Sequence, residues 1–412
     1  MAVEGSFGIL RLGDIHPVRM MGVINLSEES FYKGSVATPD RLLALACRMG
    51  EEGADLLDVG AVSTAPGSPA ISEDTERKRL FPALVRLIDD TDLPVSVDTQ
   101  RASIAKEALA AGAAGINDVS CLSDPEMAGA VADAGGSLII MASGQRPGDL
   151  LEMGEIVSRL GQKIEEAEMA GVDRHRISVD PGIGRWTEEK SHLHDLAILS
   201  GLCRLRSLNR PVVAAVSRKS FIGHVLGLAD PADRLAGSVA AAALAVYNGS
   251  HIVRTHDVGP TVHAVRMAEA VRGVPATSGK GDIEVELLAR AGHPNDSMQT
   301  LRRYGAGSDA ADILGAKMAF RVLLIQGITP MEALVIKQEM LARGGDAAVP
   351  RSALRCDPSA DRALIFGSVA QMAGLIRKLK RQPFRLPSVA EKIEAALSRD
   401  DDVRRFCLER EA

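Results

Sequence analysis

The sequence predicts a (β/α)8 barrel followed by a small domain of mixed helices and strands. Eight short runs rich in β-branched residues alternate with amphipathic helical segments over the first two-thirds of the 412 residues. Each run is largely apolar and ends in polar residues, as is typical of parallel strands that are buried on both faces. Eight such units in about 250 residues match the usual size of this barrel.

The expected strands and helices follow one another in regular order. The strands are the runs 20–27, 56–62, 94–99, 115–120, 137–143, 177–184, 211–220 and 251–258. Pro39 suits the first turn of the helix expected at 39–54, and Gly112 suits the end of the helix expected at 102–112. A doubly wound open sheet is the rival fold. No G-x-G-x-x-G motif follows any strand, so the barrel is favoured.

A change of composition divides the chain after the eighth unit. Residues 272–282 are rich in Gly, Pro, Ser and Thr, which is typical of a linker. We therefore expect a barrel domain at 1–272, a linker at 273–281 and an accessory α/β or α+β domain at 282–412. The sequence does not assign a role to that accessory domain.

The accessory domain has readable elements. We expect helical structure at 308–327 and 329–345, a strand at 362–368 and a helix at 369–382. The last helix ends in a basic run, formed by Arg377, Lys378, Lys380 and Arg381. This run is either a phosphate-binding patch or a solvated helix face, and the solvated face is the simpler interpretation.

Composition excludes several classes of protein. A net charge of −6 and only 3% aromatic residues argue against a nucleic-acid partner. Five cysteines without a C-x-x-C pair argue against a disulfide scaffold and a zinc site, and they fit a reducing cytoplasm. There is no stretch of about 18 uncharged apolar residues, and no signal peptide is recognisable, so we expect a cytoplasmic protein without a membrane span.

Chemistry-bearing side chains follow the expected strands. In such a barrel, the active site lies at the carboxyl ends of the strands. The residues expected there are Asn25, Asp58, Asp98, Asn117, Met141, Asp180, Lys219, Arg254 and His256. Any one of them could be a loop residue or a helix cap. Together they predict an active site at the mouth of the barrel.

The same segments carry a family resemblance. In order, they are MGVINLSEESF (21–31), DVGAVSTAPG (58–67), SVDT (96–99), INDVS (116–120), DPGIG (180–184), SRKSFIG (217–223) and RTHDV (254–258). Any one of these motifs is weak. Seven in this order and at barrel spacing resemble dihydropteroate synthase over residues 20–272, nearly every βα loop.

The resemblance implies a transferase of folate or folate-like cofactor synthesis. Such an enzyme condenses a 6-hydroxymethyl-dihydropterin pyrophosphate with p-aminobenzoate, or with an aniline derived from it, and releases pyrophosphate. The resemblance implies a pterin-binding barrel, a Mg²⁺ cofactor and a homodimer. The catalytic residues would be Asp98, Lys219 and Arg254.

The resemblance also distributes the substrate contacts. Four residues, Asp98, Asn117, Asp180 and Lys219, would line the pterin pocket. Pyrophosphate and its Mg²⁺ would be held by Asn25, Arg254 and His256, with Asn25 as the metal ligand. Ser220 would face the aniline, and the substrate-binding set would be completed by Asp58, Thr64 and Met141. The chemistry agrees, because a buried Asp and Asn can pair with the donor and acceptor edge of a pterin.

The loops after the first, second, fifth and sixth strands depart from the family pattern, and the first two concern pyrophosphate. Ala65 stands where the family has an arginine expected to touch pyrophosphate, and Lys33 stands where the family has an acid. Lys33 either restores the lost positive charge or is a solvated loop residue. These loops look like the variant seen in archaeal members of the family, whose aniline carries a ribosyl phosphate. The pterin motifs are intact, so the identity of the amine is the open part of the prediction.

Two alternative functions remain at this point. A methyltetrahydropterin-dependent corrinoid methyltransferase would share Asp58, Asp98, Asn117 and Asp180, but it would not need the motifs at 217–223 and 254–258. A non-catalytic pterin-binding protein would have no use for a pyrophosphate clamp. The presence of Lys219, Arg254 and His256 argues against that second alternative.

Overall fold

The computed structural model describes most of the chain. The described residues are 3–27, 41–62, 71–273, 277–278, 285–286, 297–298, 301–302, 308–357, 359 and 361–398. Internal contacts divide the chain into two compact units, 1–289 and 290–412. Within the described part, no helix is long and apolar enough to cross a bilayer.

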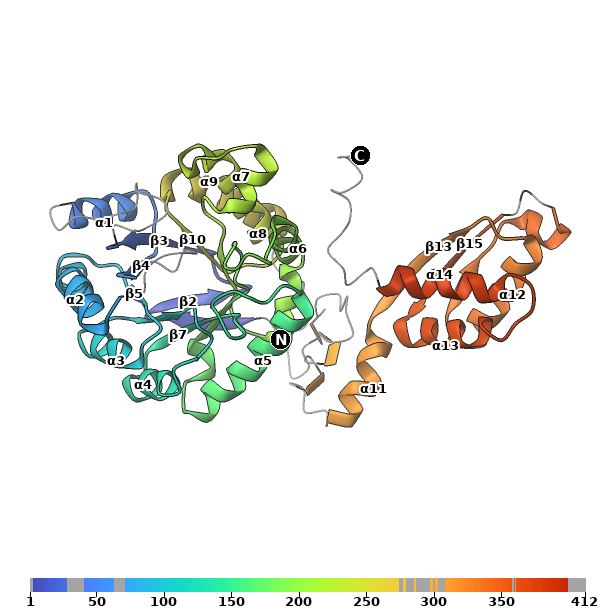
Figure 1. Cartoon of the computed structure of the whole chain (residues 1–412), viewed down its shortest axis with the longest axis horizontal. Coiled ribbons are helices and arrows are strands. Elements are labelled where there is room, and N and C mark those ends of the chain that lie inside the picture. The colour runs from blue at the N-terminus through green and yellow to red at the C-terminus, as the bar shows by residue number, and fades with distance from the viewer. Residues whose placement is uncertain are drawn as a thin grey trace. The chain divides into compact units, whose positions relative to one another are not determined.

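The first unit is an eight-stranded parallel barrel, as predicted (Figure 1). Its strands are β3 (Arg19–Asn25), β4 (Leu56–Gly60), β5 (Val95–Asp98), β6 (Gly115–Asp118), β7 (Ser137–Met141), β8 (Ile177–Asp180), β9 (Val213–Ala215) and β10 (Ile252–Thr255). The sheet order is β8-β7-β6-β5-β4-β3-β10-β9. A parallel bridge between Val179 and Val212 closes the ring between β8 and β9.

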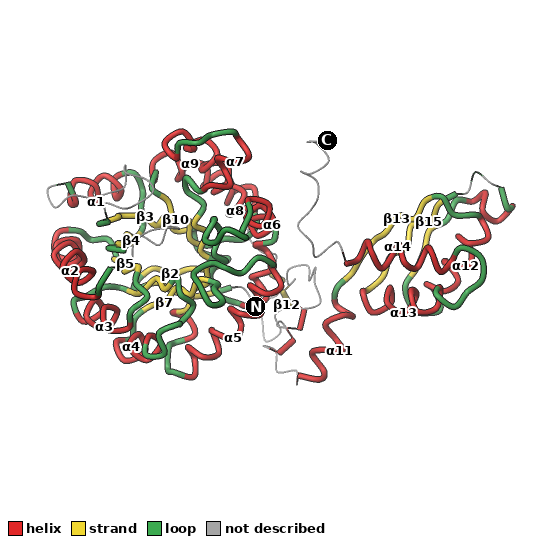
Figure 2. The backbone as a smooth tube through the Cα atoms, in the orientation of Figure 1, coloured by secondary structure: helices red, strands yellow, loops and turns green. Residues whose placement is uncertain are grey.

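Helices surround these strands, as the helix and strand colours of Figure 2 show. They are α1 (Leu42–Glu51), α2 (Glu73–Asp90), α3 (Ala102–Ala110), α4 (Met127–Ala134), α5 (Met153–Met169), α6 (His192–Ser200), α7 (Ser220–Leu226), α8 (Leu235–Tyr247) and α9 (Val258–Arg272). Gly112 follows α3 with φ +106°, which supports its predicted place at the helix end. Pro39 lies outside the described residues.

A short hairpin, which the sequence pattern does not indicate, precedes the barrel. It pairs β1 (Glu4–Phe7) with β2 (Leu10–Gly13) in antiparallel fashion. Phe7 and Leu12 are fully buried and pack on inward side chains near the amino ends of the strands. These side chains are Met21, Leu56, Ile139, Val213 and Ile252. The hairpin therefore fills the amino end of the barrel, which leaves the carboxyl end for ligands.

The second unit combines a three-stranded antiparallel sheet with helices. Its strands are β13 (Phe320–Gln326), β14 (Asp346–Ala348) and β15 (Arg362–Ser368), in the order β13-β15-β14. Its helices are α11 (Ser308–Met318), α12 (Pro330–Leu341), α13 (Val369–Leu379) and α14 (Leu386–Ser398). Thr329 caps α12 in a capping box with Glu332, which explains where that helix begins. The mixed composition of this unit was predicted.

One helical prediction in this unit is wrong. Residues 308–327 do not form one helical segment, because α11 ends at Met318 and Phe320–Gln326 is the strand β13. This strand pairs with β15 along its whole length. A short apolar run fits a helix and a strand equally well by periodicity, so the pairing partner decides between them.

The region expected to be a linker contains a strand. The strand β11 (Thr277–Ser278) lies inside the expected linker. It pairs with β12 (Val285–Glu286), which lies after the expected end of the linker at residue 281. The contact-based division falls between residues 289 and 290. The expected linker limits, 273 and 281, stay a prediction.

Candidate active site

A cavity of about 340 Å³ opens at the carboxyl ends of the barrel strands. The sequence-predicted residues that line it are Asn25, Asp98, Asn117, Met141, Asp180, Lys219, Ser220, Arg254 and His256. Asp58 lies behind this lining, and Thr64 is outside the described residues. The predicted side chains that line the cavity come from seven of the eight strands or from the loops that follow them, and they converge on one small space, as the barrel topology requires.

Asp58 corrects one expectation, because it lies in the middle of β4 and not at its end. Its carboxylate is fully buried. Arg254 Nε donates to Asp58 Oδ2 at 2.6 Å, and Asn117 Nδ2 donates to the same oxygen at 3.2 Å. Asp58 therefore orients two cavity-lining side chains, one on β6 and one on β10, each two strands from β4 in the sheet, and it does not itself line the cavity.

Arg254 links two carboxylates. Besides Asp58, its Nη2 donates to Asp98 Oδ2 at 3.2 Å. Burial and the nearby Asp58 charge raise the pKa of Asp98 to about 7, against the lowering effect of Arg254. The Arg254 guanidinium keeps a raised pKa, because the attraction of Asp58 and Asp98 outweighs its burial. The site therefore holds a permanent cation beside a carboxyl group that changes charge near neutral pH.

His256 provides a neutral polar group beside this cation. Burial and the charges of Arg254, Arg218 and Lys219 lower its pKa to about 3. Its Nδ1 lies 3.0 Å from the Ser217 hydroxyl. At neutral pH the imidazole can therefore hydrogen-bond to a ligand without adding a charge.

Asp180 and Lys219 line the same cavity, and each influences the charge of the other. Asp180 ends β8, and its Oδ1 accepts from the Gly182 amide at 2.7 Å. Burial raises the pKa of Asp180, while the Lys219 charge opposes that rise. Burial likewise lowers the pKa of Lys219, and Asp180 opposes that change. Lys219 Nζ donates to the Ile183 carbonyl and lies 5.0 Å from the centre of the Trp186 ring.

Two buried groups outside the predicted site residues hold the loop after β8. Lys190 is fully buried, and its Nζ donates to the carbonyls of Gly182 at 2.7 Å and Gly148 at 3.0 Å. Asp195 accepts from the Gly184 amide at 2.7 Å. Both residues follow the DPGIG motif, but their roles depend on how the loop folds back, which no sequence spacing indicates.

Arg218 clamps the neighbouring loop. Its φ of 57° lies in the left-handed region, which is rare for a residue with a large side chain. The guanidinium donates to both Asp257 oxygens, at 2.8 and 2.7 Å. It also donates to the Pro231 and Ala232 carbonyls. These bonds fix the backbone that presents Lys219 and Ser220 to the cavity.

The cavity has further lining residues outside the predicted set. They include Ser27, Arg185, Trp186, Ser217 and Arg234. Arg185 and Trp186 directly follow DPGIG, and Ser217 begins the SRKSFIG motif, so position next to a motif was a usable signal. Arg234 ends the short helix η4 (Pro231–Arg234), which carries no motif.

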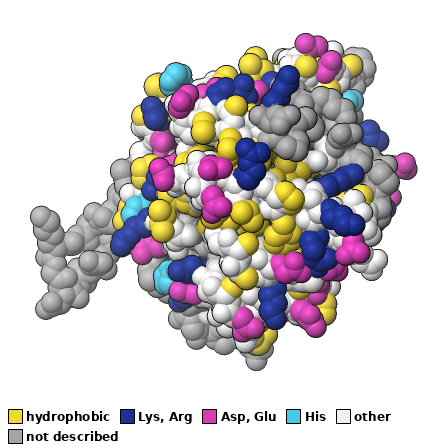
Figure 3. Space-filling model, turned by 90° about the vertical axis from the view of Figure 1, so that its left-hand side faces the viewer, with side chains coloured by type: hydrophobic (Ala, Val, Ile, Leu, Met, Phe, Trp, Pro, Cys, Tyr) yellow, Lys and Arg dark blue, Asp and Glu magenta, His cyan; other side chains and the backbone are white. Residues whose placement is uncertain are grey.

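The outer surface contrasts with the cavity. On the barrel face drawn in Figure 3, lysine and arginine side chains are interspersed with aspartate and glutamate. Mixed charge of this kind produces no strong field of one sign. That face therefore offers no general electrostatic preference for a ligand of one charge.

The comparisons with known proteins agree on one family. The model of the pterin binding enzymes matches residues 21–256. Dihydropteroate synthase of Bacillus subtilis is 37% identical over 258 residues, covering 61% of this chain and 88% of that protein. The Escherichia coli K12 dihydropteroate synthase is 33% identical over 265 residues, covering 62% and 92%.

Solved structures that are similar to the chain belong to the same family. The Xanthomonas albilineans dihydropteroate synthase with 4-aminobenzoic acid has 39% identity and a TM-score of 0.60. It covers 67% of this chain and 100% of that one. The same enzyme in complex with 7,8-dihydropteroate has 37% identity and a TM-score of 0.57, with 66% and 100% covered.

Proposed function

The chain belongs to the dihydropteroate synthase family of pterin-binding enzymes, and from that premise we propose how its barrel carries out the condensation. The reaction is a transfer of the pterin methylene from pyrophosphate oxygen to the amine nitrogen of p-aminobenzoate. The main support for this proposal is that one cavity is lined by Asn117, Asp180, Lys219 and Arg254. It places groups for a polar heterocycle beside a permanent cation.

The pterin ring fits the deeper part of this cavity. Asp180 and Asn117 can accept from the ring N–H and amino groups, and Lys219 can donate to the ring carbonyl. Lys219 is buried, and its ammonium group donates to the Ile183 carbonyl. In the complex, the pterin carbonyl would offer this ammonium group a further acceptor. An analogue that lacks one of these ring groups leaves a buried partner unpaired, which gives strong selectivity.

Charge stabilisation accounts for the bond-breaking step. The C–O bond to pyrophosphate breaks while the pterin methylene gains positive charge, and the ionised Asp98 carboxylate stabilises that charge. Arg254 offers a guanidinium to the departing pyrophosphate. The neutral His256 donates or accepts beside it. The aromatic amine attacks as the neutral species and then loses its proton to water or to the departing anion.

A Mg²⁺ ion suits the donors present at the mouth. Among the described residues no group of three or more His, Cys, Asp or Glu side chains could hold a metal. Mg²⁺ commonly binds through one or two protein oxygens together with water and substrate phosphate, so the amide oxygen of Asn25 fits that need. The ion would neutralise pyrophosphate charge when bound.

Lys33 is proposed to replace the missing loop arginine at Ala65, although both residues lie outside the described ones. Removal of a transition-state charge contact typically costs about 10²-fold in turnover. Lys33→Ala is therefore expected to lower kcat by that order, and Ala65→Arg in the same chain is expected to restore part of it. Wild-type turnover in Lys33→Ala would show that the lysine is only a loop residue.

We also propose a homodimer in the cytoplasm. Large apolar side chains are exposed together on α7, α8 and α9, namely Val225, Leu226, Leu244, Tyr247, Met267 and Val271. Such a patch on adjacent helices is typical of a subunit interface. The five cysteines of the chain include no C-x-x-C pair, which supports a reducing compartment. Sedimentation analysis of the wild type and of Leu244→Lys tests the dimer.

The proposed activity is tested by following pyrophosphate release. The purified chain is mixed with the dihydropterin pyrophosphate, Mg²⁺ and either p-aminobenzoate or its ribosyl-phosphate derivative. Release that depends on p-aminobenzoate supports the proposal, and dihydropteroate is identified by mass spectrometry. Release only with the ribosyl-phosphate derivative would identify that derivative, and not p-aminobenzoate, as the amine substrate. Absence of release with both amines would contradict the proposed condensation.

A further inference from the structure

The C-terminal unit differs in charge from the chain as a whole. The whole chain carries a formal charge of −6, yet residues 308–398 contain 13 lysines and arginines against 9 aspartates and glutamates. This excess is not spread evenly. Five of the cations line one surface cavity of about 880 Å³, together with Phe320, Gly344, Ser368, Ala370, Gln371 and Gly374. None of the described residues that line this cavity carries a carboxylate.

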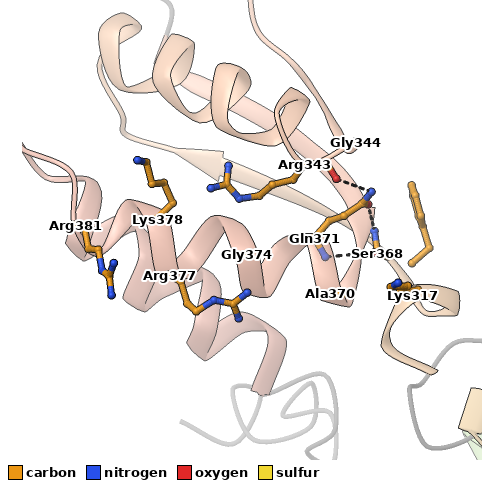
Figure 4. A pocket seen from close by; sticks show the side chains of 11 residues that line it. Lys317, Arg343, Gly344, Ser368, Ala370, Gln371, Gly374, Arg377, Lys378 and Arg381 are labelled. Atoms are coloured by element: carbon orange, nitrogen blue, oxygen red, sulfur yellow. Dashed lines mark hydrogen bonds between the residues drawn. The ribbon is translucent and has the colours of Figure 1, made fainter. Parts of the chain in front are cut away.

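The five cations come from three helices and their ends (Figure 4). Lys317 lies near the end of α11, Arg343 follows α12, and Arg377, Lys378 and Arg381 lie on or just after α13. Of the basic run noted in the sequence, Lys380 is the member that does not line the cavity. It pairs with Glu394 at 2.6 Å. Three cations of the basic run therefore line the cavity, and the fourth is neutralised by a carboxylate elsewhere.

The cavity-lining cations are poorly neutralised by the protein itself. Arg343 pairs with Glu339 at 2.7 Å. Within the described part of the chain, Lys317, Arg377, Lys378 and Arg381 have no carboxylate partner within ion-pair distance. Like charges gathered in this way repel one another, and that cost is offset when a multiply charged anion binds among them.

One side of the cavity is held in place. The Gln371 side chain accepts from the Ser368 amide at 2.7 Å and donates to the Arg343 carbonyl at 3.0 Å. Gly374 leaves room for the Arg343 side chain, because a Cβ there would lie 3.2 Å from Arg343 Cδ. Arg343 therefore lies across α13, beside the helix face that carries Lys378, as Figure 4 shows. A guanidinium held in this way loses little freedom on binding.

We propose that this cavity binds a diphosphate group, free or attached to a small organic molecule. Arginines bind phosphate oxygens bidentately, and several cations around one cavity favour two linked phosphoryl groups over a single one. Phe320 lines the same cavity with 55% of its surface exposed. It offers a flat apolar wall to a ring attached to the diphosphate. The site is separate from the barrel cavity and shares no residue with it.

Calorimetric titration of the full chain tests this proposal. The probes are inorganic pyrophosphate, adenosine diphosphate and, as the phosphate-free control, adenosine. The variant is Arg377→Ala/Arg381→Ala, and the matched control is Lys380→Ala, whose partner is Glu394. Circular dichroism and the barrel's condensation rate establish that both variants are folded. Neither variant touches the barrel cavity.

The expected result is a binding component that persists in Lys380→Ala and weakens at least about tenfold in Arg377→Ala/Arg381→Ala. Adenosine is expected not to bind there. Any pyrophosphate binding in the barrel persists in both variants, so the difference between them isolates the C-terminal site. Binding of adenosine diphosphate alone supports the organic source, and binding of pyrophosphate alone supports the free one.

Three outcomes would overturn the proposal. The first is no binding of either diphosphate beyond that seen in Arg377→Ala/Arg381→Ala. The second is equal weakening in Lys380→Ala, which would show a general charge effect. The third is tight binding of a single-stranded RNA oligonucleotide where neither diphosphate binds, which would assign the cations to a nucleic acid.

Discussion

At the scale of single residues, Asp180 is expected to determine pterin affinity. Asp180→Ala removes a buried acceptor for the pterin donors, and a hydrogen bond to a charged group is worth about 1.5–3 kcal/mol. Pterin affinity measured by calorimetry is expected to fall by at least tenfold, while the fold stays intact. Asp118→Asn is the control, because Asp118 is buried on β6, two strands from β8, and accepts from the Ser120 and Leu122 amides without lining the cavity. Equal loss in both variants would contradict the assignment.

Asp98 is expected to set the pH dependence. Its pKa of about 7 is higher than usual, so the carboxyl group is neutral below that pH and charged above it. If the charged form stabilises the pterin methylene, kcat/KM rises with pH and levels off above about 7. Asp98→Asn should abolish this acid limb and lower kcat by about 10²-fold. An unchanged acid limb in Asp98→Asn would assign it to another group.

At the scale of elements, the ion pair between Arg218 and Asp257 joins the loop after β9 to the start of α9. Asp257→Ala leaves the Arg218 guanidinium buried without its carboxylate, and breaking such a pair costs about 3–5 kcal/mol. Urea unfolding should show a loss of that order. Asp361→Ala removes the partner of an exposed arginine, Arg362, and should change stability far less. Similar small losses in both variants would mean that the backbone bonds of Arg218 suffice.

At the scale of the whole molecule, the amino-terminal hairpin is expected to stabilise the barrel from the end opposite to the active site. Phe7 is fully buried among inward side chains, so Phe7→Ala should lower the free energy of unfolding by about 3–5 kcal/mol. Ile9, in the turn of the same hairpin, is 86% exposed, and Ile9→Ala should have almost no effect. A KM for the pterin substrate that rises in Phe7→Ala would show that the two ends are coupled.

The barrel and most of its active site were predictable from sequence because the signals are local. A parallel strand covered on both faces must be apolar along its length, and its polar neighbours must lie at its ends. Asp98 and Asp180 end their strands and line the cavity as expected. The order of the motifs indicates the family. The barrel topology then brings the carboxyl ends of all the strands, and the motifs that follow them, to one mouth.

Other features were decided only by contacts between distant segments. Phe320–Gln326 is a strand because β15 pairs with it, and Lys190 holds the loop after β8 because two carbonyls turn toward it. The basic run could be a phosphate-binding patch or a solvated helix face, and its spacing does not decide between them. In the structure, Lys380 pairs with Glu394 while Arg377 lines a cavity. The barrel, the family and the set of polar residues at the barrel mouth follow from the sequence, because periodicity and motifs are properties of neighbouring residues. The tertiary structure decided which polar groups pair and which remain for a ligand, because burial and charge pairing depend on residues far apart in the chain.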